Sequence, residues 1–360
     1  MKILYDHQIF SFQMHGGISR YFIELIKGLP GNYKYEISVL FSENVYLLEE
    51  KKTFSLKPFF LKSTIRIKLY KYINLLYTNY RIKKGNFDVF HPTYYYDYYV
   101  GKTKKPFIVT VHDLIPELYQ DIFFSANHNL LIQRKKVIEN ATRVIAISEN
   151  TKKDLVEFYK IAPDKIDVIY HGPNTFKKDK IENKWGKYLL YVGSRESYKN
   201  FDFFISSISN LLSRYEDIKV ICVGSKFTNK EIKFLEDLGL YNKIISIQAD
   251  NTTLYQLYSN AICFVYPSLY EGFGMPILEA FDCGCPVVMS NTSSMPEVAV
   301  DSGIYFDPKD SHSIATNIEK VIVDSDLRSE LISNGYKRLN YFSWDKCVEE
   351  TQKTYLKCLV

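Results

Sequence analysis

The residues best suited to chemistry form a short segment that runs from Glu271 to Glu279. Two glycines flank Phe273 in this segment, and Pro276 stands where a helix would begin. Proline suits the first turn of a helix, and the free N–H groups of a helix start bind phosphate. An ordinary helix start needs no carboxylate on either side of it. We therefore predict that the segment binds a phosphate-bearing ligand and that Glu271 and Glu279 accept hydrogen bonds from its hydroxyl groups.

Two cations, Arg195 and Lys199, follow directly on an apolar run that ends in a glycine, 188–193. Ligands of parallel α/β sheets bind at the carboxyl ends of the strands, where paired cations suit a diphosphate. Such cations would neutralise the charge that grows on a departing nucleotide. A solvated basic turn is the alternative for these two residues taken alone. Beside the acidic segment, we predict a nucleotide diphosphate site.

The first half of the chain contributes two further candidates. Gly16 and Gly17 open a helix, so a diphosphate or an acceptor could approach the backbone closely; a plain turn is the alternative. His112 ends an apolar run and precedes Asp113, which we expect to shape the loop. A polar pair at such a strand end suits a ligand site, and a simple cap of the strand is the alternative.

Apolar runs that predict strands alternate with helical segments through both halves of the chain. The predicted strands are 2–5, 35–41, 88–91, 107–111, 143–147, 166–170, 188–193, 218–224, 244–247, 262–266, 286–289 and 303–306. The predicted helices include 18–28, 125–140, 149–159 and 344–359. This alternation predicts two doubly wound α/β domains, with ligands at the carboxyl ends of the strands in a cleft between them.

A chain of 360 residues with 46% hydrophobic residues is long enough for two packed domains. A polar, lysine-rich stretch, 174–186, suits a linker. We therefore expect an N-terminal domain over 1–173 and a C-terminal domain over 187–342. A last helix within 343–360 is expected to cross back to the first domain.

The segment 271–279 resembles the signature of the retaining glycosyltransferases of family 4, also called glycosyl transferases group 1. Four more segments resemble that family in the expected order. They are the glycine-rich loop 16–21, the active-site strand end 109–114, the diphosphate-binding segment 191–200 and the strand after the signature, 284–288. The resemblance spans nearly the whole chain. It implies the GT-B fold, in which two Rossmann-like doubly wound domains face each other across a cleft.

The resemblance also assigns roles to single residues. The residues that it assigns to the sugar donor are Gly16, Gly17, Arg195, Lys199, Phe273, Gly274 and Glu279. Arg195 and Lys199 would hold the pyrophosphate, to which Phe273 and Gly274 would offer backbone N–H groups. Glu279 would accept hydrogen bonds from the ribose hydroxyls.

Two residues are implied at the reacting centre. Glu271 would meet the donor sugar, and His112 would contact the sugar near the bond that breaks. The nucleobase would lie against backbone groups of a loop that contains Gln248 and Ala249, and uracil, guanine and adenine all stay open.

The implied reaction is the retaining transfer of a hexosyl unit, of mannose or glucose type, from a nucleotide-diphosphate sugar to a saccharide or lipid-linked saccharide. Cell-surface polysaccharide or lipopolysaccharide synthesis is the implied setting. The donor phosphate itself would help to deprotonate the acceptor, so we expect positioning and electrostatics rather than covalent catalysis. We expect no cofactor and no metal ion, because the Asp-x-Asp triplet at 324–326 reads as a helix cap.

The stretch 51–87 carries ten Lys or Arg residues and no Asp or Glu. Its apolar residues at helical spacing are Leu61, Ile65, Leu69, Ile73, Leu76 and Tyr80. A basic amphipathic helix could lie on an anionic membrane or receive an anionic acceptor. A core-facing helix with solvated lysines is the alternative. The tyrosine-rich stretch that follows, 91–99, could serve as an acceptor platform or be buried packing.

The cysteines and the apolar runs bear on location. The six cysteines lie mostly in apolar runs, which indicates free thiols in a reducing compartment. Cys283 and Cys285 lack a second Cys/His pair at metal-ligand spacing. No run of eighteen apolar residues occurs, so we expect a cytoplasmic protein with at most a peripheral contact on the inner face of the cell membrane.

Several other functions compete with this interpretation. Another GT-B enzyme, such as a nucleotide-sugar epimerase or an inverting transferase, would share the scaffold. A non-catalytic nucleotide-sugar or membrane-binding module would be expected to lack Glu271, Lys199 or His112, and all three are present. A nicotinamide enzyme would need G-x-G-x-x-G after the first strand, where Asp6-His7-Gln8 stands instead. We expect no nucleic-acid partner, because the basic stretch contains no recognisable reading motif.

Overall fold

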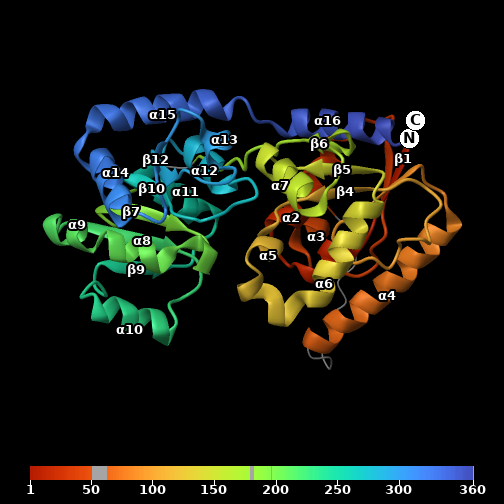
Figure 1. The fold of residues 1–360 in the computed structure, drawn as a ribbon, viewed down its shortest axis with the longest axis horizontal. Helices are drawn as coiled ribbons and strands as arrows, with labels where there is room; N and C mark the ends of the chain where they lie inside the picture. Colours follow the sequence, from red (N-terminus) through yellow and green to blue (C-terminus); the bar gives the residue numbers. More distant parts are fainter. Residues whose placement is uncertain (51–62, 179–181, 196, 360) are drawn as a thin grey trace. The chain divides into compact units, whose positions relative to one another are not determined.

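The structure is a computed structural model of the chain, and it describes residues 1–50, 63–178, 182–195 and 197–359 (Figure 1). The chain divides into two compact units. The first unit comprises Met1–Gly172 and Ser343–Val360, and the second comprises Pro173–Phe342. Each unit is built on parallel strands, with helices that connect one strand to the next.

The first unit contains six short parallel strands. They are β1 (Lys2–Tyr5), β2 (Lys34–Ile37), β3 (Val89–His91), β4 (Ile108–Val111), β5 (Arg143–Ala146) and β6 (Ile166–Val168). The strands pair in the orders β2-β1-β3 and β4-β5-β6, and a single parallel bridge between Phe90 and Phe107 joins β3 to β4. The order 2-1-3-4-5-6 reverses between β1 and β3, which makes the carboxyl ends of these two strands the switch point of the sheet.

Nine helices accompany this sheet in the described part of the first unit. They are α1 (Gln8–Phe12), α2 (Gly17–Gly28), α3 (Val45–Glu49), α4 (Ser63–Lys84), α5 (Ile115–Leu118), α6 (Gln120–Asn140), α7 (Glu149–Tyr159), the 3-10 turn η1 (Pro163–Lys165) and α16 (Trp344–Lys357). The last of these packs on α2 so closely that a Cβ on Gly28 would lie 2.5 Å from the Val348 side chain. A buried hydrogen bond of 2.8 Å joins the hydroxyls of Tyr5 and Tyr355, so the end of the chain is tied to the first strand.

The second unit contains one six-stranded parallel sheet. Its strands are β7 (Lys187–Val192), β8 (Ile218–Val223), β9 (Ile244–Ile247), β10 (Cys263–Tyr266), β11 (Val287–Ser290) and β12 (Ile304–Phe306), in the order β12-β11-β10-β7-β8-β9. The strand β10 is buried throughout, as expected of a parallel strand covered on both faces. The order reverses between β7 and β10, which is therefore the switch point of this sheet.

Helices connect these strands and cover the sheet. They are η2 (Ser197–Lys199), α8 (Phe201–Ser207), α9 (Ser209–Arg214), α10 (Asn229–Asp237), α11 (Asn251–Asn260), α12 (Met275–Asp282), α13 (Met295–Ala299), α14 (Ser311–Val323) and α15 (Ser325–Leu339). Asp324 caps α15 by accepting a hydrogen bond of 2.8 Å from the Leu327 N–H, which confirms the predicted helix cap.

The predicted strands are all present, with differences at their ends. The largest concerns the predicted strand 35–41, which ends at Ile37. The N–H groups of Leu40 and Phe41 donate to Oδ1 of Asn74 on α4 instead of to a strand, because this side chain competes for them. The helices α1, α3 and α5 were not predicted, since four or five residues carry too little periodicity to identify a helix.

The basic stretch 51–87 is described only from residue 63 onward, so the first part of that prediction, with Leu61, lies outside the described residues. The described part forms α4, which buries Tyr70, Asn74, Thr78 and Ile82. Of the predicted apolar positions, Ile65, Leu69, Leu76 and Tyr80 are exposed, whereas Ile73 is half-buried. The four exposed residues and Tyr72, which was not part of the prediction, are called the apolar stripe of α4 and are 43–60% exposed. The core-facing alternative for this stripe is therefore wrong, because a narrow, partly polar face makes the contact with the first unit.

Candidate active site

The loops that follow β7 and β10 bring two of the predicted residues together at the switch point of the second unit. Lys199 Nζ lies 2.7 Å from Glu271 Oε1, although 72 residues separate them in the chain. Their side chains are only 16% and 9% exposed. Tyr266, the last residue of β10, also forms a hydrogen bond with Glu271, and burial together with this carboxylate raises the pKa of Tyr266 well above its usual value. Glu271 is thus held as a carboxylate acceptor between a cation and a phenol.

Two serines that the sequence analysis missed hold the loop that carries Glu271. Ser293 Oγ accepts a hydrogen bond of 2.9 Å from the Glu271 N–H. Ser294 is fully buried, and its hydroxyl lies 2.9 Å from the carbonyl oxygens of both Glu271 and Phe273. A serine before a helix start is typical of a helix cap, yet the Ser294 side chain makes no cap hydrogen bond at the start of α13.

The helix α12 begins where the sequence predicted it. Gly274 precedes it with a φ of +106°, and a Cβ there would lie 2.9 Å from Ile277 Cδ1, so the position favours glycine. The Phe273 side chain is 3% exposed and packs edge-on against Phe342, with ring centroids 5.7 Å apart. Because the side chain is buried, only the backbone N–H of Phe273 could make the predicted phosphate contact.

Glu279 lies one turn into α12. Its Oε1 accepts a hydrogen bond of 2.6 Å from Asn174 Nδ2, and the hydroxyl of Tyr258 lies 3.4 Å from Oε2. Asn174 belongs to the stretch 174–186 that was expected to be a linker. The part described up to residue 178 instead packs on α12, where the Phe176 N–H donates to Asp282 Oδ2 at 3.2 Å. Residues 179–181 of that predicted linker lie outside the described residues.

The structure gives Arg195 a different environment from the one predicted. Its Nε lies 2.5 Å from Glu231 Oε1, its Nη2 donates to the carbonyls of Ser225 and Lys226, and its side chain is 4% exposed. The guanidinium also stacks over Phe227, 4.7 Å from the ring centroid. In this conformation Arg195 ties the ends of β7 and β8 together, and Lys199 is the predicted cation that meets Glu271.

The predicted base loop follows β9 at the same edge of the sheet. Gln248 is exposed and Ala249 is half-buried. Asp250 caps α11 by accepting a hydrogen bond of 2.8 Å from the Thr253 N–H, which fixes where the loop ends. The loop is therefore open to a ligand at the carboxyl end of an edge strand.

His112 ends β4 in the first unit and is 8% exposed. Its N–H donates to the Tyr95 hydroxyl at 3.2 Å, and its ring stands edge-on to Tyr21, with centroids 5.3 Å apart. Among the described residues, no hydrogen-bond partner of the buried His112 Nε2 is present. Because buried polar atoms usually have partners, this nitrogen is a candidate for a ligand contact.

His112 lies in a group of three buried histidines, which we call the histidine cluster: His91, His112 and His171. Burial lowers the pKa values of His91 and His171 to about 3. The pKa of His112 is also well below its usual value, first through burial and then through electrostatic repulsion between its protonated form and His171, Arg134 and His91. All three rings are therefore neutral near pH 7, so His112 can offer a hydrogen bond but not a positive charge.

Arg134, on α6, supports the turn that carries His112, and the sequence analysis did not identify it. Its Nε lies 3.0 Å from Glu117 Oε1, and its Nη2 donates to the carbonyl oxygen of Asp113. The guanidinium lies over Tyr95, 4.3 Å from the ring centroid. Because Tyr95 in turn binds the His112 N–H, Arg134 positions both sides of the turn.

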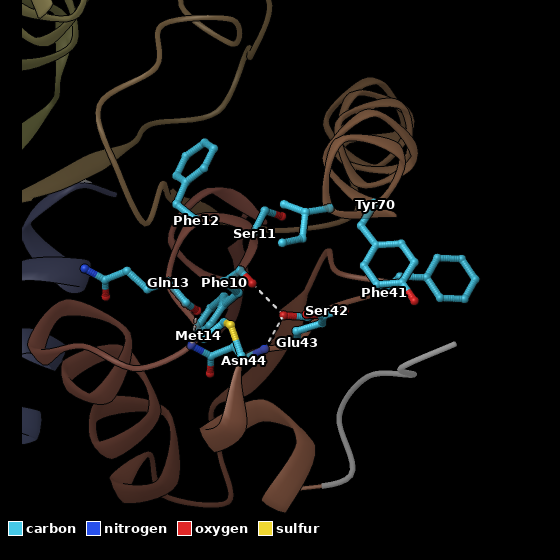
Figure 2. Close-up of a pocket in the computed structure, with 11 residues that line it drawn as sticks. Phe10, Ser11, Phe12, Gln13, Met14, Phe41, Ser42, Glu43, Asn44 and Tyr70 are labelled. Carbon is cyan, nitrogen blue, oxygen red and sulfur yellow. Dashed lines mark hydrogen bonds between the residues drawn. The ribbon is translucent and has the colours of Figure 1, made fainter. Parts of the chain in front are cut away.

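Gly16 and Gly17 open α2 as predicted. A Cβ on Gly17 would meet nothing within 4 Å, so this backbone is open to a ligand, whereas Gln13 occupies the space beside Gly16. Figure 2 shows the segment before them: Ser42 Oγ donates to the Phe10 carbonyl at 2.5 Å, and Asn44 Nδ2 donates to the Gln13 carbonyl at 2.7 Å. The hollow between these residues has a volume of about 40 Å³, which is enough for a few water molecules only. We therefore assign Ser42 and Asn44 to holding the loop rather than to binding a ligand.

The comparisons with known proteins identify the family of the chain. Residues 173–338 match the family described as glycosyl transferases group 1, and residues 15–175 match glycosyltransferase family 4. The chain belongs to glycosyltransferase family 4. The family resemblance seen in the sequence is therefore confirmed, and the enzyme is a hexosyltransferase.

Curated relatives and solved structures extend the match over the whole enzyme. The O-antigen chain mannosyltransferase B of Escherichia coli is 25% identical over 387 residues, which cover 99% of each chain. CapM of Staphylococcus aureus, a capsular polysaccharide biosynthesis glycosyltransferase, is 30% identical over 250 residues, which cover 63% of this chain and 66% of CapM.

Two solved structures illustrate the fold. Sucrose-phosphate synthase from Thermosynechococcus elongatus has a TM-score of 0.76 at 19% identity, with 99% of this chain and 98% of that chain covered. Anabaena HepE in complex with UDP-glucose has a TM-score of 0.74 at 18% identity, with 98% and 99% covered. These likenesses confirm the predicted GT-B fold of two Rossmann-like domains.

Two further observations concern membranes and metals. In the described part of the enzyme, no helix combines the length and the apolar character needed to cross a membrane. Within the same residues, no three His, Cys, Asp or Glu side chains are grouped as metal ligands would be. Cys283 and Cys285 are buried free thiols.

Proposed function

We propose that this enzyme transfers a hexosyl unit, with retention of anomeric configuration and without a metal ion, from a nucleotide-diphosphate sugar to a saccharide or lipid-linked saccharide. Mannose is the favoured sugar, because curated relatives over the whole or most of the chain are named mannosyltransferases. The same names, together with that of CapM, support a role in cell-surface polysaccharide synthesis. We place this step at the cytoplasmic face of the cell membrane as part of the proposal.

The observation that carries the proposal is the ion pair of Lys199 and Glu271 at the switch point of the second unit. A diphosphate bound at the start of α12 would lie beside a cation, as the leaving group of such a transfer requires. Glu271 would then face the sugar that the diphosphate carries. Glu279, held by Asn174 and Tyr258, offers its carboxylate to the ribose hydroxyls.

Retention fits a front-face substitution in this setting. Glu271 is engaged by Lys199 and Tyr266, which lowers its nucleophilicity and suits a hydrogen-bond acceptor better than an attacking group. The donor phosphate would take the proton of the acceptor hydroxyl, and neutral His112 would contribute a hydrogen bond to the sugar. Lys199 and the helix start would supply the positive charge that a metal ion supplies in other transferases.

The test is a thermal-shift panel of UDP-, GDP- and ADP-sugars with chelator present, on wild type and on Glu279→Ala. One nucleotide series should stabilise the wild type, and the variant should respond about tenfold more weakly, as expected for the loss of a charged hydrogen bond. NMR of the product made from that donor should show the donor's anomeric configuration. An inverted product, or activity that returns only with added magnesium or manganese, would overturn the mechanism.

We also propose that the apolar stripe of α4 lies on an anionic membrane. Its five side chains are exposed, and Lys68, Lys83 and Lys84 are exposed beside them, with no acidic residue on the helix. Such a helix binds through buried apolar area and through attraction to acidic lipids.

Sedimentation with vesicles tests this surface. The enzyme should bind vesicles that contain phosphatidylglycerol and not those of pure phosphatidylcholine, and Leu69→Ser/Leu76→Ser should abolish binding. The matched control is Ile132→Ser/Leu356→Ser, which removes two equally exposed apolar side chains elsewhere on the first unit. Equal binding by both double variants would refute the role of the stripe.

A further inference from the structure

A second hollow, of about 530 Å³, lies at the carboxyl ends of β1 and β3 in the first unit. These are the strands at which the strand order reverses, and ligands of open parallel sheets bind at such points. The volume is in the range of about 300–1,000 Å³ typical of small-molecule sites. We call it the switch-point pocket and define it by His7, Phe12, Lys68, Lys71, Tyr96 and Gln133, which line it.

One wall of the pocket is fixed by the buried carboxylate of Asp6. Its Oδ1 accepts hydrogen bonds from the N–H and hydroxyl of Thr93, at 2.8 and 2.6 Å. Its Oδ2 accepts from Gln8 Nε2 at 2.6 Å and from the Tyr98 hydroxyl at 2.9 Å. The Gln8 amide is also bound to the backbone of Tyr96. This network joins the loops after β1 and β3, so the wall is formed before any ligand arrives.

The lining carries positive charge without a compensating carboxylate. Lys71 Nζ lies over the Phe12 ring, 4.4 Å from its centroid. Within the described part of the chain, neither Lys68 nor Lys71 forms an ion pair, whereas Asp97, at the same pocket, is paired with Lys136 at 2.6 Å. The two lysines are therefore available to an anion, and phosphate oxygens are strong acceptors for such cations.

Two buried polar atoms of the pocket also lack partners. His7 is 4% exposed and its Nδ1 lies 3.2 Å from Ser11 Oγ, but its Nε2 has no hydrogen-bond partner among the described residues. The same holds for Gln133 Oε1 within those residues. Buried polar atoms are rarely left unsatisfied, so these two suit the hydroxyl groups of a ligand.

Aromatic rings complete the lining. Phe12 and Tyr96 are 36% and 38% exposed, with ring centroids 5.2 Å apart. Figure 2 shows the Phe12 ring projecting away from Phe10 and Met14; Phe12 lines both the small hollow there and the larger hollow described here. Exposed ring faces can pack against the C–H face of a sugar, while the hydroxyls reach polar groups.

We propose that the switch-point pocket binds a phosphate-bearing sugar of the acceptor, with the phosphate on Lys68 and Lys71 and the sugar ring against Phe12 and Tyr96. This inference rests on the proposed function, whose acceptor it specifies. A free sugar phosphate and a lipid-linked sugar diphosphate share this chemistry. Tyr72, which also lines the pocket, belongs to the apolar stripe of α4.

The test measures acceptor binding by calorimetry on the full chain, with the donor site saturated by the nucleoside diphosphate that stabilises it most. The probes are mannose 1-phosphate, polyprenyl diphosphate-linked mannose in nanodiscs, and the neutral methyl α-mannoside. Lys68→Gln/Lys71→Gln should weaken binding of a charged probe at least about tenfold, as expected when charge-assisted hydrogen bonds are lost. The control Lys135→Gln/Lys153→Gln removes the same amount of charge from exposed positions. It should change the affinity for the charged probe less than about twofold.

A second variant, His7→Phe, removes Nε2 while it keeps a flat ring, and should weaken binding of the same probe about fivefold. Binding of the lipid-linked probe alone, with the same sensitivity to the lysines, would support the proposal and identify the lipid source. The proposal is overturned if neither charged probe depends on the two lysines, or if methyl α-mannoside binds as tightly. Lysine-dependent binding without any response to nucleotide sugars would support the pocket and refute the proposed nucleotide-sugar donor site.

Discussion

The substitution Glu271→Gln tests the centre of the proposed site, because glutamine keeps the shape of the side chain and an oxygen for the Tyr266 hydroxyl. It removes the charge that lies 2.7 Å from Lys199 Nζ. Breaking a fully buried pair costs about 3–5 kcal/mol, and breaking an exposed pair costs about 0–1 kcal/mol. For side chains that are 16% and 9% exposed, we expect a loss of about 2 kcal/mol in the free energy of unfolding.

The effect on catalysis should be larger than the effect on stability. A loss of about 2 kcal/mol lowers the Tm of a unit of this size by about 4–8 °C and leaves it folded at 25 °C. Removing a charge that faces the transition state should reduce kcat by about 100- to 1,000-fold. The assay is product formation under saturating donor, beside calorimetric unfolding of the same preparation.

Glu319 on α14 offers a matched control. It also accepts from a cation and a phenol: its Oε1 lies 2.8 Å from Arg214 Nη1 and 3.0 Å from the Tyr215 hydroxyl. Glu319→Gln should cost less than about 1 kcal/mol and leave kcat unchanged, because this pair is more exposed and remote from the switch point. If Glu271→Gln kept kcat within about threefold of wild type, the assignment of Glu271 to the donor sugar would be refuted.

Three further predictions concern the supports of the two sites. Ser294→Ala leaves two loop carbonyls without their hydroxyl donor, so it should lower stability by about 1–3 kcal/mol and raise the KM for the donor. Gly274→Ala forces a φ of +106° on alanine, which should cost about 1–3 kcal/mol and weaken nucleotide binding in the thermal-shift assay. Acidification from about pH 6.5 to about pH 5 should destabilise the first unit by about 2 kcal/mol for each histidine of the cluster whose pKa is about 3, because only the unfolded state binds those protons. Urea unfolding followed by Trp344 fluorescence in a Trp185→Phe background measures this slope.

Each of these predictions can fail separately. Unchanged donor KM in Ser294→Ala would show that the loop keeps its shape without the hydroxyl, and full stability in Gly274→Ala would show that the turn relaxes. If the first unit were equally stable at about pH 6.5 and about pH 5, the histidines would be protonated in the folded state. The sign follows from the lowered pKa values: this stability is complete above about pH 6.5 and is lost as the pH falls.

The sequence predicted more of the second unit than of the first. Glycines, a proline and two carboxylates at short spacing mark a phosphate site wherever they follow a buried strand, so segment 271–279 could be interpreted locally. Arg195 could not, because Glu231, which captures its guanidinium, comes from a helix 36 residues later. Ser294 gave no signal either, since a serine before a helix normally predicts a cap.

The basic helix α4 shows the same limit in the first unit. Its pattern fitted both a membrane-facing and a core-facing helix, because periodicity identifies a stripe but not what the stripe faces. Asn74 and Thr78 decide the matter: Asn74 accepts from the Leu40 N–H after β2, and Thr78 binds the Ser38 hydroxyl. This polar face therefore lies inward, and the apolar stripe stays outside.

By itself, the sequence determined the alternation of strands and helices, the family and the residue types at each strand end, since these depend on local pattern and spacing. Tertiary structure alone decided which of those strand ends meet. The strand order places β7 beside β10 and β1 beside β3, so Lys199 meets Glu271 and His7 joins the loop of Tyr96. Strand order depends on packing between distant segments, and local sequence patterns therefore do not predict it.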